Sequence, residues 1–330
     1  MPTEFKSEHA SNKLDGKLVY FVKSTVNNDT AMIVFFNGEY LDKAGVRIAP
    51  DDRGFLFGDG VYEVVRSHRG RLFRWQDHQQ RLLHGLRELR IGGVDAGSLE
   101  SAARQLLRQN RLEREEATVY LQATRGAGPR THRFPPPGTL PTVYIEAKPF
   151  TPPIEARQKG AAAIIVPDQR WGRCDIKSIN LLANVLANQQ AFEAGAVEAI
   201  FSRDGFLLEG SHSSILFVKD NVLVYPPLTN FILPGVTREV VLSLAAGESI
   251  AIECRACRES EIFDFQEVLM VGTGSEIIPL TKVNDREIGD GKPGPVALRL
   301  QRAFQELIGT SQEHSELSPT EQGRGPAVKP

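Results

Sequence analysis

The 330-residue sequence is poor in cysteine and contains no long apolar run. Its three cysteines, Cys174, Cys254 and Cys257, are an odd number and too few for the disulfide scaffold of a secreted domain. The last two have the Cys-x-x-Cys spacing of half a zinc site, but no second cysteine pair or histidine pair accompanies them, so we expect no metal. The longest apolar runs, such as Ala161–Val166, fall far short of the roughly 20 residues of a membrane span.

An excess of charge of either sign is also missing. Lysine and arginine number 39 against 41 aspartates and glutamates, which leaves a net charge of 39 − 41 = −2. This balance provides no basic field to attract nucleic acid or an anionic membrane. The first residues, MPTEFKSEHASNKLDGK, are polar and lack the apolar segment of a signal peptide. The sequence therefore predicts a soluble, cytoplasmic protein with no nucleic-acid or membrane partner.

Length and composition indicate how the chain is divided. An apolar content of 41% and a charged content of 24% are ordinary for globular proteins, and 330 residues exceed what one compact core usually holds. We therefore expect two domains. Residues 1–16 and 310–330 are polar and predict disordered tails. A proline-rich stretch predicts a linker at 149–158, between a smaller N-terminal domain at 17–148 and a larger C-terminal domain at 159–309.

Apolar patterns predict strands and helices in both halves. The turn Asn37-Gly38 predicts a hairpin, and Arg69-Gly70 a second turn. Because strands and helices mix without regular alternation, we expect an α+β fold rather than a doubly wound sheet. Strands are expected at 18–22, 32–36, 62–71, 118–124, 142–147, 161–166, 197–201, 214–218, 222–225 and 268–271, and helices at 75–89, 99–109, 179–195, from about 237, and at 296–307.

Lys177 stands in an unusual setting, between the run Cys174–Ile176 and the apolar segment Ile179–Leu182. A lysine near a helix end is most often structural, with its stem packed and its ammonium in water. Apolar flanks also give the partial desolvation that keeps an amine neutral and nucleophilic for Schiff-base formation. Taken alone, Lys177 favours the structural interpretation.

Other segments supply groups that complement such a lysine. Glu209 follows two leucines and precedes small residues, where an exposed structural glutamate would be unusual. The turn LPGVTR at 233–238 leads into a helix, and TGSE at 273–276 follows a strand; both suit phosphate binding by backbone N–H groups. Arg81 on the expected helix can offer a bidentate cation. Each signal is common by itself, so only their joint presence carries weight.

Longer segments, spanning residues 53–277, carry a family resemblance. The sequence resembles the fold-type IV enzymes that use pyridoxal 5′-phosphate (PLP), and most of all the bacterial D-amino-acid aminotransferases. The segments are RGFLFGDGVYEVV (53–65), TRGAGPRTHRF (124–134), RWGRCDIKSINLL (170–182), EGS (209–211), LPGVTREVV (233–241) and GSEI (274–277).

The resemblance implies a two-domain α+β fold with its active site between the domains. It implies that Lys177 binds PLP as a Schiff base and then moves a proton between the substrate Cα and a cofactor carbon. Glu209 would pair with the pyridinium nitrogen. The phosphate would be held by Arg81, Val236, Thr237 and Thr273, and the substrate by Tyr62, Arg130 and His132, the last two reaching in from the other subunit of a homodimer.

Some positions depart from the family pattern. Leu208 stands where relatives often carry threonine, and the run SHSS at 211–214 where Ser-Ser-Ser-Asn or similar is usual. Gly272 and Gly274 flank Thr273 where relatives can have hydroxyl residues. These changes, His212 and Ser214 included, bear on hydrogen bonding around the ring and on cofactor affinity, but leave the class of enzyme unchanged.

Several reactions share the scaffold that the resemblance implies. They are transamination of D-amino acids, of branched-chain L-amino acids or of R-amines, and aminodeoxychorismate lysis; a non-catalytic PLP-binding protein is a further alternative. Arg130 and His132 stand two apart on an extended loop, so both can meet one carboxylate, although a basic surface loop is the plainer interpretation of these two alone. With the resemblance, the pair favours D-amino acids such as D-alanine and D-glutamate, with pyruvate or 2-oxoglutarate as acceptor in a ping-pong reaction.

Overall fold

The chain forms two compact units, Met1–Met32 and Ile33–Pro330. In the first unit, β1 (Ser11–Leu14) and β2 (Lys17–Tyr20) pair as antiparallel strands. The tail expected at 1–16 therefore contains a strand, because residues 11–14 pair with β2; the rest of that range lies outside the described residues. The computed structural model describes residues 11–14, 17–20 and 31–316, with side chains described for 31–309.

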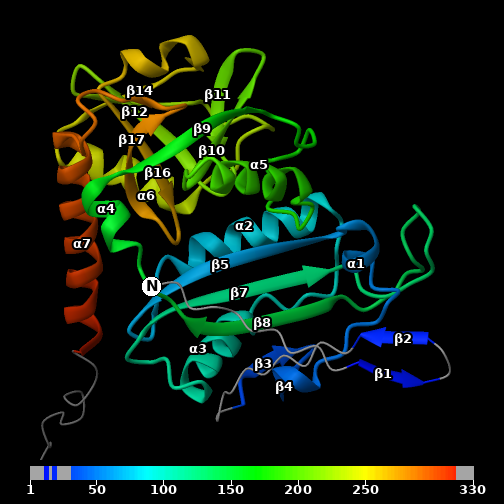
Figure 1. The fold of residues 1–330 in the computed structure, drawn as a ribbon. Coiled ribbons are helices and arrows are strands. Elements are labelled where there is room, and N and C mark those ends of the chain that lie inside the picture. Colours follow the sequence, from blue (N-terminus) through cyan, green and yellow to red (C-terminus); the bar gives the residue numbers. More distant parts are fainter. Residues whose placement is uncertain (1–10, 15–16, 21–30, 317–330) are drawn as a thin grey trace, which may run out of the picture. The chain divides into compact units, whose positions relative to one another are not determined.

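A six-stranded antiparallel sheet organises the first part of the second unit (Figure 1). The hairpin expected at Asn37-Gly38 is confirmed, and both residues have the positive φ, 50° and 97°, that a tight hairpin turn requires. In sheet order the strands are β4 (Glu39–Asp42), β3 (Ile33–Phe36), β8 (Thr142–Pro149), β7 (Glu116–Thr124), β5 (Gly60–His68) and β6 (Arg71–Leu72).

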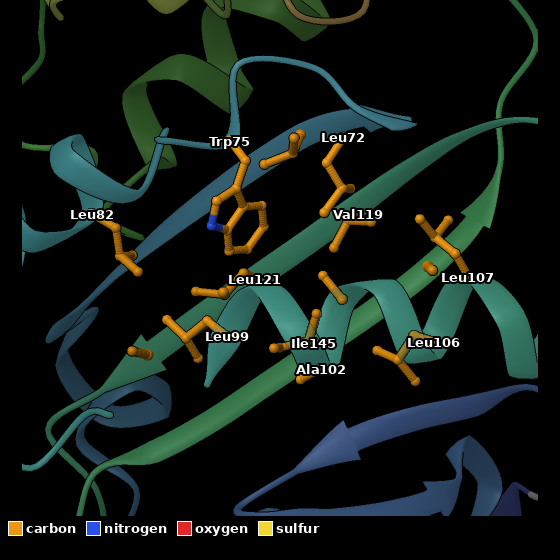
Figure 2. Packing of buried hydrophobic residues seen from close by; sticks show 14 of the residues in the cluster. Leu72, Trp75, Leu82, Leu99, Ala102, Leu106, Leu107, Val119, Leu121 and Ile145 are labelled. Carbon is orange, nitrogen blue, oxygen red and sulfur yellow. The ribbon is translucent and has the colours of Figure 1, made fainter. Parts of the chain in front are cut away.

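One face of this sheet is apolar and packs against α2 (Trp75–Glu88) and α3 (Leu99–Gln109). Figure 2 shows Trp75 of α2 close to Leu121 of β7 and Leu99 of α3. The opposite face carries Tyr62 and other polar side chains, because residues alternate between the two faces of a strand. Shorter helices flank the sheet: η1 (Lys43–Gly45) and α1 (Arg53–Phe57).

A ten-stranded mixed sheet organises the remainder. Helices α6 (Val236–Gly247) and α7 (Pro295–Glu316) pack on one part of it and α5 (Leu182–Glu193) on another. Along the sheet the strands are β14 (Ala251–Cys254), β13 (Val222–Tyr225), β12 (Ser214–Lys219), β16 (Glu267–Gly272), β17 (Glu276–Val283), β9 (Ala161–Pro167), β10 (Glu198–Arg203), β11 (Phe206–Gly210) and β15 (Cys257–Arg258), with β18 (Arg286–Glu287) beside β17.

The structure differs from the expected elements in several places. The expected linker at 149–158 contains a helix, α4 (Ile154–Lys159), which packs near β17 through its partly buried Ala156. The last helix continues to Glu316, so the first residues of the tail expected at 310–330 are helical; those after 316 lie outside the described residues. A short 3-10 helix, η2 (Glu259–Asp264), was not expected. The division into two domains at this linker stays a prediction.

The fold class is confirmed as α+β, since helices and both sheets mix without regular alternation. Among the described helices, none is both long and apolar enough to cross a membrane.

Candidate active site

Lys177 lies in an irregular segment that pairs with the edge of β5. Its carbonyl accepts a hydrogen bond from the backbone N–H of Tyr62 at 3.0 Å, and the N–H of Ile179 donates to the carbonyl of Gly60 at 3.1 Å. The segment up to Ile179 runs beside β5, and α5 begins at Leu182 and not at the expected position 179. The pairing brings Lys177 Nζ to 4.3 Å from the centre of the Tyr62 ring. A lysine and a tyrosine more than 100 residues apart are thus fixed beside each other.

A cavity of about 770 Å³, part of it open to solvent, lies around Lys177, and we call it the chamber. Every residue predicted to hold the cofactor lines it, as does Tyr62 from β5. Apolar and polar side chains both line the chamber, and several of its polar groups converge, as they do in ligand sites. Its predicted residues are Tyr62, Arg81, Lys177, Glu209, Val236, Thr237 and Thr273, and its other lining residues include Arg170, Ser178, Asn180, Asn184, His212, Gly235 and Arg238.

Glu209 at the end of β11 is a buried carboxylate held from two sides. Arg170 Nη1 donates a hydrogen bond to its Oε1, and the N–H of Leu233 donates to its Oε2 at 3.0 Å. Burial raises the pKa of Glu209 to about 7, while the charge of Arg170 pulls the pKa the other way. Arg170 is itself held by Asp168, at 2.9 Å from Oδ1. A cationic N–H group placed against Glu209 would favour its ionised form.

The start of α6 forms one wall of the chamber. Its N-cap is Gly235, which has no side chain to accept hydrogen bonds from the N–H groups of the first turn. A Cβ at this position would meet Ser214 Oγ at 2.6 Å. Free N–H groups at a helix N-terminus attract anions. Thr237 adds a hydroxyl, and Arg238, only 3% exposed, has a buried Nε without a hydrogen-bond partner among the described residues. These groups suit a phosphate.

Arg81 reaches the chamber wall from α2 but is already paired. Its Nε and Nη2 donate to the carboxylate of Glu63 at 2.7 and 2.9 Å, and its Nη1 donates to the carbonyl of Pro234 at 2.8 Å. Burial alone would raise the pKa of Glu63, yet the charge and hydrogen bonds of Arg81, with His78, lower that pKa to about 2. Arg81 therefore links α2 to the turn before α6 and lies beside the start of α6.

Arg130 and His132 lie next to each other but outside the chamber of their own chain. Both side chains are exposed and approach Phe57 of α1, at 5.6 Å for the guanidinium and 5.8 Å for the imidazole ring. His132 lines a second cavity, which shares Trp171, Ser178 and Asn180 with the chamber. The carboxylate trap predicted from the sequence is thus brought together as a pair, but not onto Lys177 of the same subunit.

The sequence prediction missed the residues that support the site. Arg170 and Arg238 stand inside segments that carried the resemblance, and Glu63 directly follows Tyr62, but none of them was assigned a role. An arginine or glutamate inside an otherwise apolar strand or motif was the available signal, since charged residues are seldom fully buried unless paired. Their partners could be identified only from the fold.

Comparisons with known proteins agree with this geometry. Residues 60–283 match the family model "Amino-transferase class IV". A D-alanine aminotransferase of Bacillus licheniformis is 39% identical over 84% of this chain and 97% of its own, and one of Staphylococcus haemolyticus 37% identical over 83% and 97%.

Solved structures give the same answer at the level of the fold. A branched-chain amino acid aminotransferase of Escherichia coli superposes with a TM-score of 0.78 at 28% identity, covering 84% of this chain and 95% of its own. The branched-chain enzyme of Thermoproteus uzoniensis, solved with norvaline, has a TM-score of 0.76 at 25% identity, covering 87% and 98%. A further branched-chain enzyme, solved in complex with N-(5′-phosphopyridoxyl)-L-glutamate, has a TM-score of 0.77 at 25% identity, covering 87% and 97%. The chain therefore belongs to the class IV aminotransferases, whose cofactor is PLP.

Proposed function

We propose that this aminotransferase moves the amino group of a D-amino acid, such as D-alanine or D-glutamate, to a 2-oxo acid, such as pyruvate or 2-oxoglutarate, in two half-reactions. The observation that carries the proposal is the chamber, in which Lys177 lies between a buried carboxylate and an anion-binding helix start. The relatives named D-alanine aminotransferase, 35–39% identical over most of the chain, support the choice of D-amino acids.

The chamber fits PLP at both ends of the cofactor. The phosphate would be held by Thr237, Thr273 and Arg238, whose Nε makes no hydrogen bond with the described residues. Val236 at the start of α6 and Arg81 beside it would contribute as well. Glu209 would pair with the ring nitrogen, whose positive charge offsets the effect of burial on this carboxylate. When bound, PLP supplies an electron sink for the electrons of the broken Cα–H bond.

Lys177 is the group we assign to proton transfer. Its Nζ makes no hydrogen bond or ion pair with the residues that the structure describes, and the Tyr62 ring shields it on one side. As a neutral amine, it takes a proton from the Cα of the D-amino acid in the first half-reaction. In the second half-reaction it gives a proton to the Cα of the amino acid that is formed. Tyr62 and the peptide pairing with β5 keep this amine in position.

The substrate carboxylate is held, in this proposal, by Arg130 and His132 of the other subunit of a homodimer. A single chain leaves both outside its own chamber, which favours contribution across an interface. Apolar side chains on the outer face of α5 support such an interface, because exposed apolar patches mark contact surfaces. On α5 the exposed residues are Leu182 (69%), Val185 (59%), Leu186 (58%) and Phe192 (74%).

A location in the cytoplasm is part of the same proposal. All three cysteines are free thiols, as a reducing compartment would keep them.

Branched-chain L-amino acids are the second candidate substrate, because the solved structures with the fold include enzymes named for them. A half-reaction panel separates the two candidates. D-alanine, D-glutamate, L-leucine and L-isoleucine are each added to the PLP-loaded enzyme, and the visible absorbance of the cofactor is followed. We expect the D-amino acids to bleach this absorbance; bleaching by L-leucine and L-isoleucine alone would contradict the proposal.

A further inference from the structure

Beside the chamber, Glu198 of β10 forms a buried hub of hydrogen bonds. Its side chain is fully buried, and its Oε1 accepts from the N–H groups of Ala199 and Ser211, each at 2.8 Å, and from Ser211 Oγ at 2.5 Å. Its Oε2 accepts from Ser213 Oγ at 2.5 Å. Burial raises the pKa of Glu198, but the hydrogen bond and charge of His212 and the hydroxyls of Ser211 and Ser213 outweigh it, so the pKa is lowered.

His212 places its ring between this hub and the chamber. Its Nδ1 lies 3.2 Å from Glu198 Oε2 and 3.2 Å from Ser211 Oγ, with Asn188 Nδ2 at 3.4 Å. An ionised carboxylate only accepts hydrogen bonds, so we assign the proton of the neutral ring to Nδ1. This leaves Nε2 as the free basic nitrogen. The side chain is 56% exposed and lines the chamber with Lys177, at a position where the family pattern has serine.

Two charged groups act on His212: Glu198 behind it and Lys177 across the chamber. Burial disfavours the charged imidazole, but the hydrogen bond and charge of Glu198 outweigh burial and raise the pKa of His212, while the charge of Lys177 lowers it. The neighbours on α5, Asn184 and Asn188, are neutral. An imidazole oriented by a carboxylate, with its other nitrogen free, is the arrangement of a general base.

We propose that His212, oriented by Glu198, is a second acid–base group of the chamber and takes from Lys177 the proton that its amine must lose before it can act on a substrate. The proposal rests on the proposed function, in which Lys177 works as a neutral amine. His212 does not act on the substrate itself; it acts through the protonation state of Lys177.

The step is a single proton transfer. An N–H bond of the Lys177 ammonium breaks and its electron pair stays on Nζ. The proton moves across the chamber that both residues line and bonds to Nε2 of His212. Glu198 stabilises the imidazolium, and the exposed ring passes the proton on to solvent. An ammonium has no lone pair to accept a proton, so Lys177 needs an acceptor for its own proton before it can act as a base, and His212 lines the same chamber.

The test compares His212→Gln and His212→Ala with wild type in D-alanine transamination across a pH series. We expect kcat to fall about tenfold or more, with the KM for D-alanine changed by less than about twofold and the limb of the pH profile due to His212 lost. Added imidazole should restore part of the activity of His212→Ala, because the ring site is open to solvent. His84→Gln, at a histidine of α2 that does not line the chamber, is the control and should behave as wild type.

A second readout is independent of turnover. In enzyme loaded with pyridoxamine 5′-phosphate, which leaves Lys177 free, the His212 ring is titrated by NMR. Its pKa should lie above that of an ordinary histidine and rise further in Lys177→Ala. An unchanged pKa in Lys177→Ala, or kcat and pH profile unchanged in both His212 variants, would overturn the proposal. If wild type does not react with D-alanine but the pKa of His212 still rises in Lys177→Ala, only the proposed substrate is refuted.

Discussion

Among single residues, Arg170 has the largest influence on Glu209. It donates to the carboxylate of Glu209 while its own charge is balanced by Asp168, and its guanidinium lies 4.3 Å from the centre of the Phe201 ring. Without this cation, only the N–H of Leu233 and the charge of Lys177 would oppose the effect of burial, and the pKa of Glu209 would rise above the value of about 7 that it has now. Glu209 would then be neutral over a wider range of pH.

Replacing Arg170 with methionine should weaken PLP binding by about tenfold or more, as loss of a supporting hydrogen bond does at other sites. The loss should be greater at pH 6.5 than at pH 8.5, because a raised pKa leaves more of the carboxyl protonated at the lower pH. Absorbance titration with PLP measures the affinity. Arg173→Met, on an exposed arginine paired with Asp175, is the control. Equal affinities in wild type and Arg170→Met would refute the role of Arg170.

At the residue scale, the sequence identified residues that the fold brings together. Lys177, Glu209 and residues of the two turns predicted to hold the phosphate lie in local motifs with recognisable residue types, and all of them line the chamber. Their roles stay predictions. The support behind them could not be predicted. Arg170 meets Glu209 across 39 positions and Arg81 meets Glu63 across 18, and such pairs depend on how strands and helices are arranged.

At the scale of elements, α1 fixes the loop that carries Arg130 and His132. Arg53 on α1 is 4% exposed; its Nη1 donates to the carbonyls of Thr131 at 2.7 Å and Arg133 at 3.3 Å, and its Nε to Asp59 at 2.8 Å. At the start of the loop, Gly126 has φ 86°, and a Cβ there would meet the carbonyl of Leu140 at 1.9 Å. Arg53 thus holds the loop through its backbone carbonyls, and the side chains of Arg130 and His132 stay exposed.

Arg53→Lys removes the planar fork that reaches both carbonyls and Asp59. If the loop holds the substrate carboxylate, the KM for D-alanine should rise about tenfold, because the groups that bind the carboxylate are misplaced. The affinity for PLP should stay unchanged, because Arg53 does not line the chamber. Steady-state kinetics and PLP titration measure the two quantities. Arg133→Ala, which keeps the carbonyl that Arg53 contacts, is the matched control. An unaltered KM in Arg53→Lys would argue against this role of the loop.

Elements with a clear period were predicted and the others were not. The helix at 99–109 and the hairpin at Asn37-Gly38 agree with the structure. Strand β17 was missed because Pro279 interrupts its pattern, although it pairs within the sheet. Strand β11 is five residues long and carries the buried Glu209, so a charged residue concealed it.

At the scale of the whole molecule, one subunit carries an incomplete proposed site. The chamber is lined by Lys177 and Glu209, whereas Arg130 and His132 lie beside Phe57 and do not line it. The outer face of α5 is apolar, while Ala187 and Ala191 on its inner face pack toward the sheet. The apolar pattern of α5 could not show which of its residues face the sheet and which face outward. A helix face buried against a partner subunit and one buried against the core of the same chain have similar apolar compositions.

A mixed dimer measures this arrangement most directly. One subunit carries Lys177→Ala and the other Arg130→Ala, and two different affinity tags isolate the mixed species. Each variant alone should lose most of its D-alanine transamination, and Lys177→Ala should also lose the visible absorbance of bound PLP. If Arg130 acts across the interface, the mixed dimer has one intact site and should show about half of wild-type activity. A mixed dimer no more active than its two parents would contradict a site built from Lys177 of one subunit and Arg130 of the other.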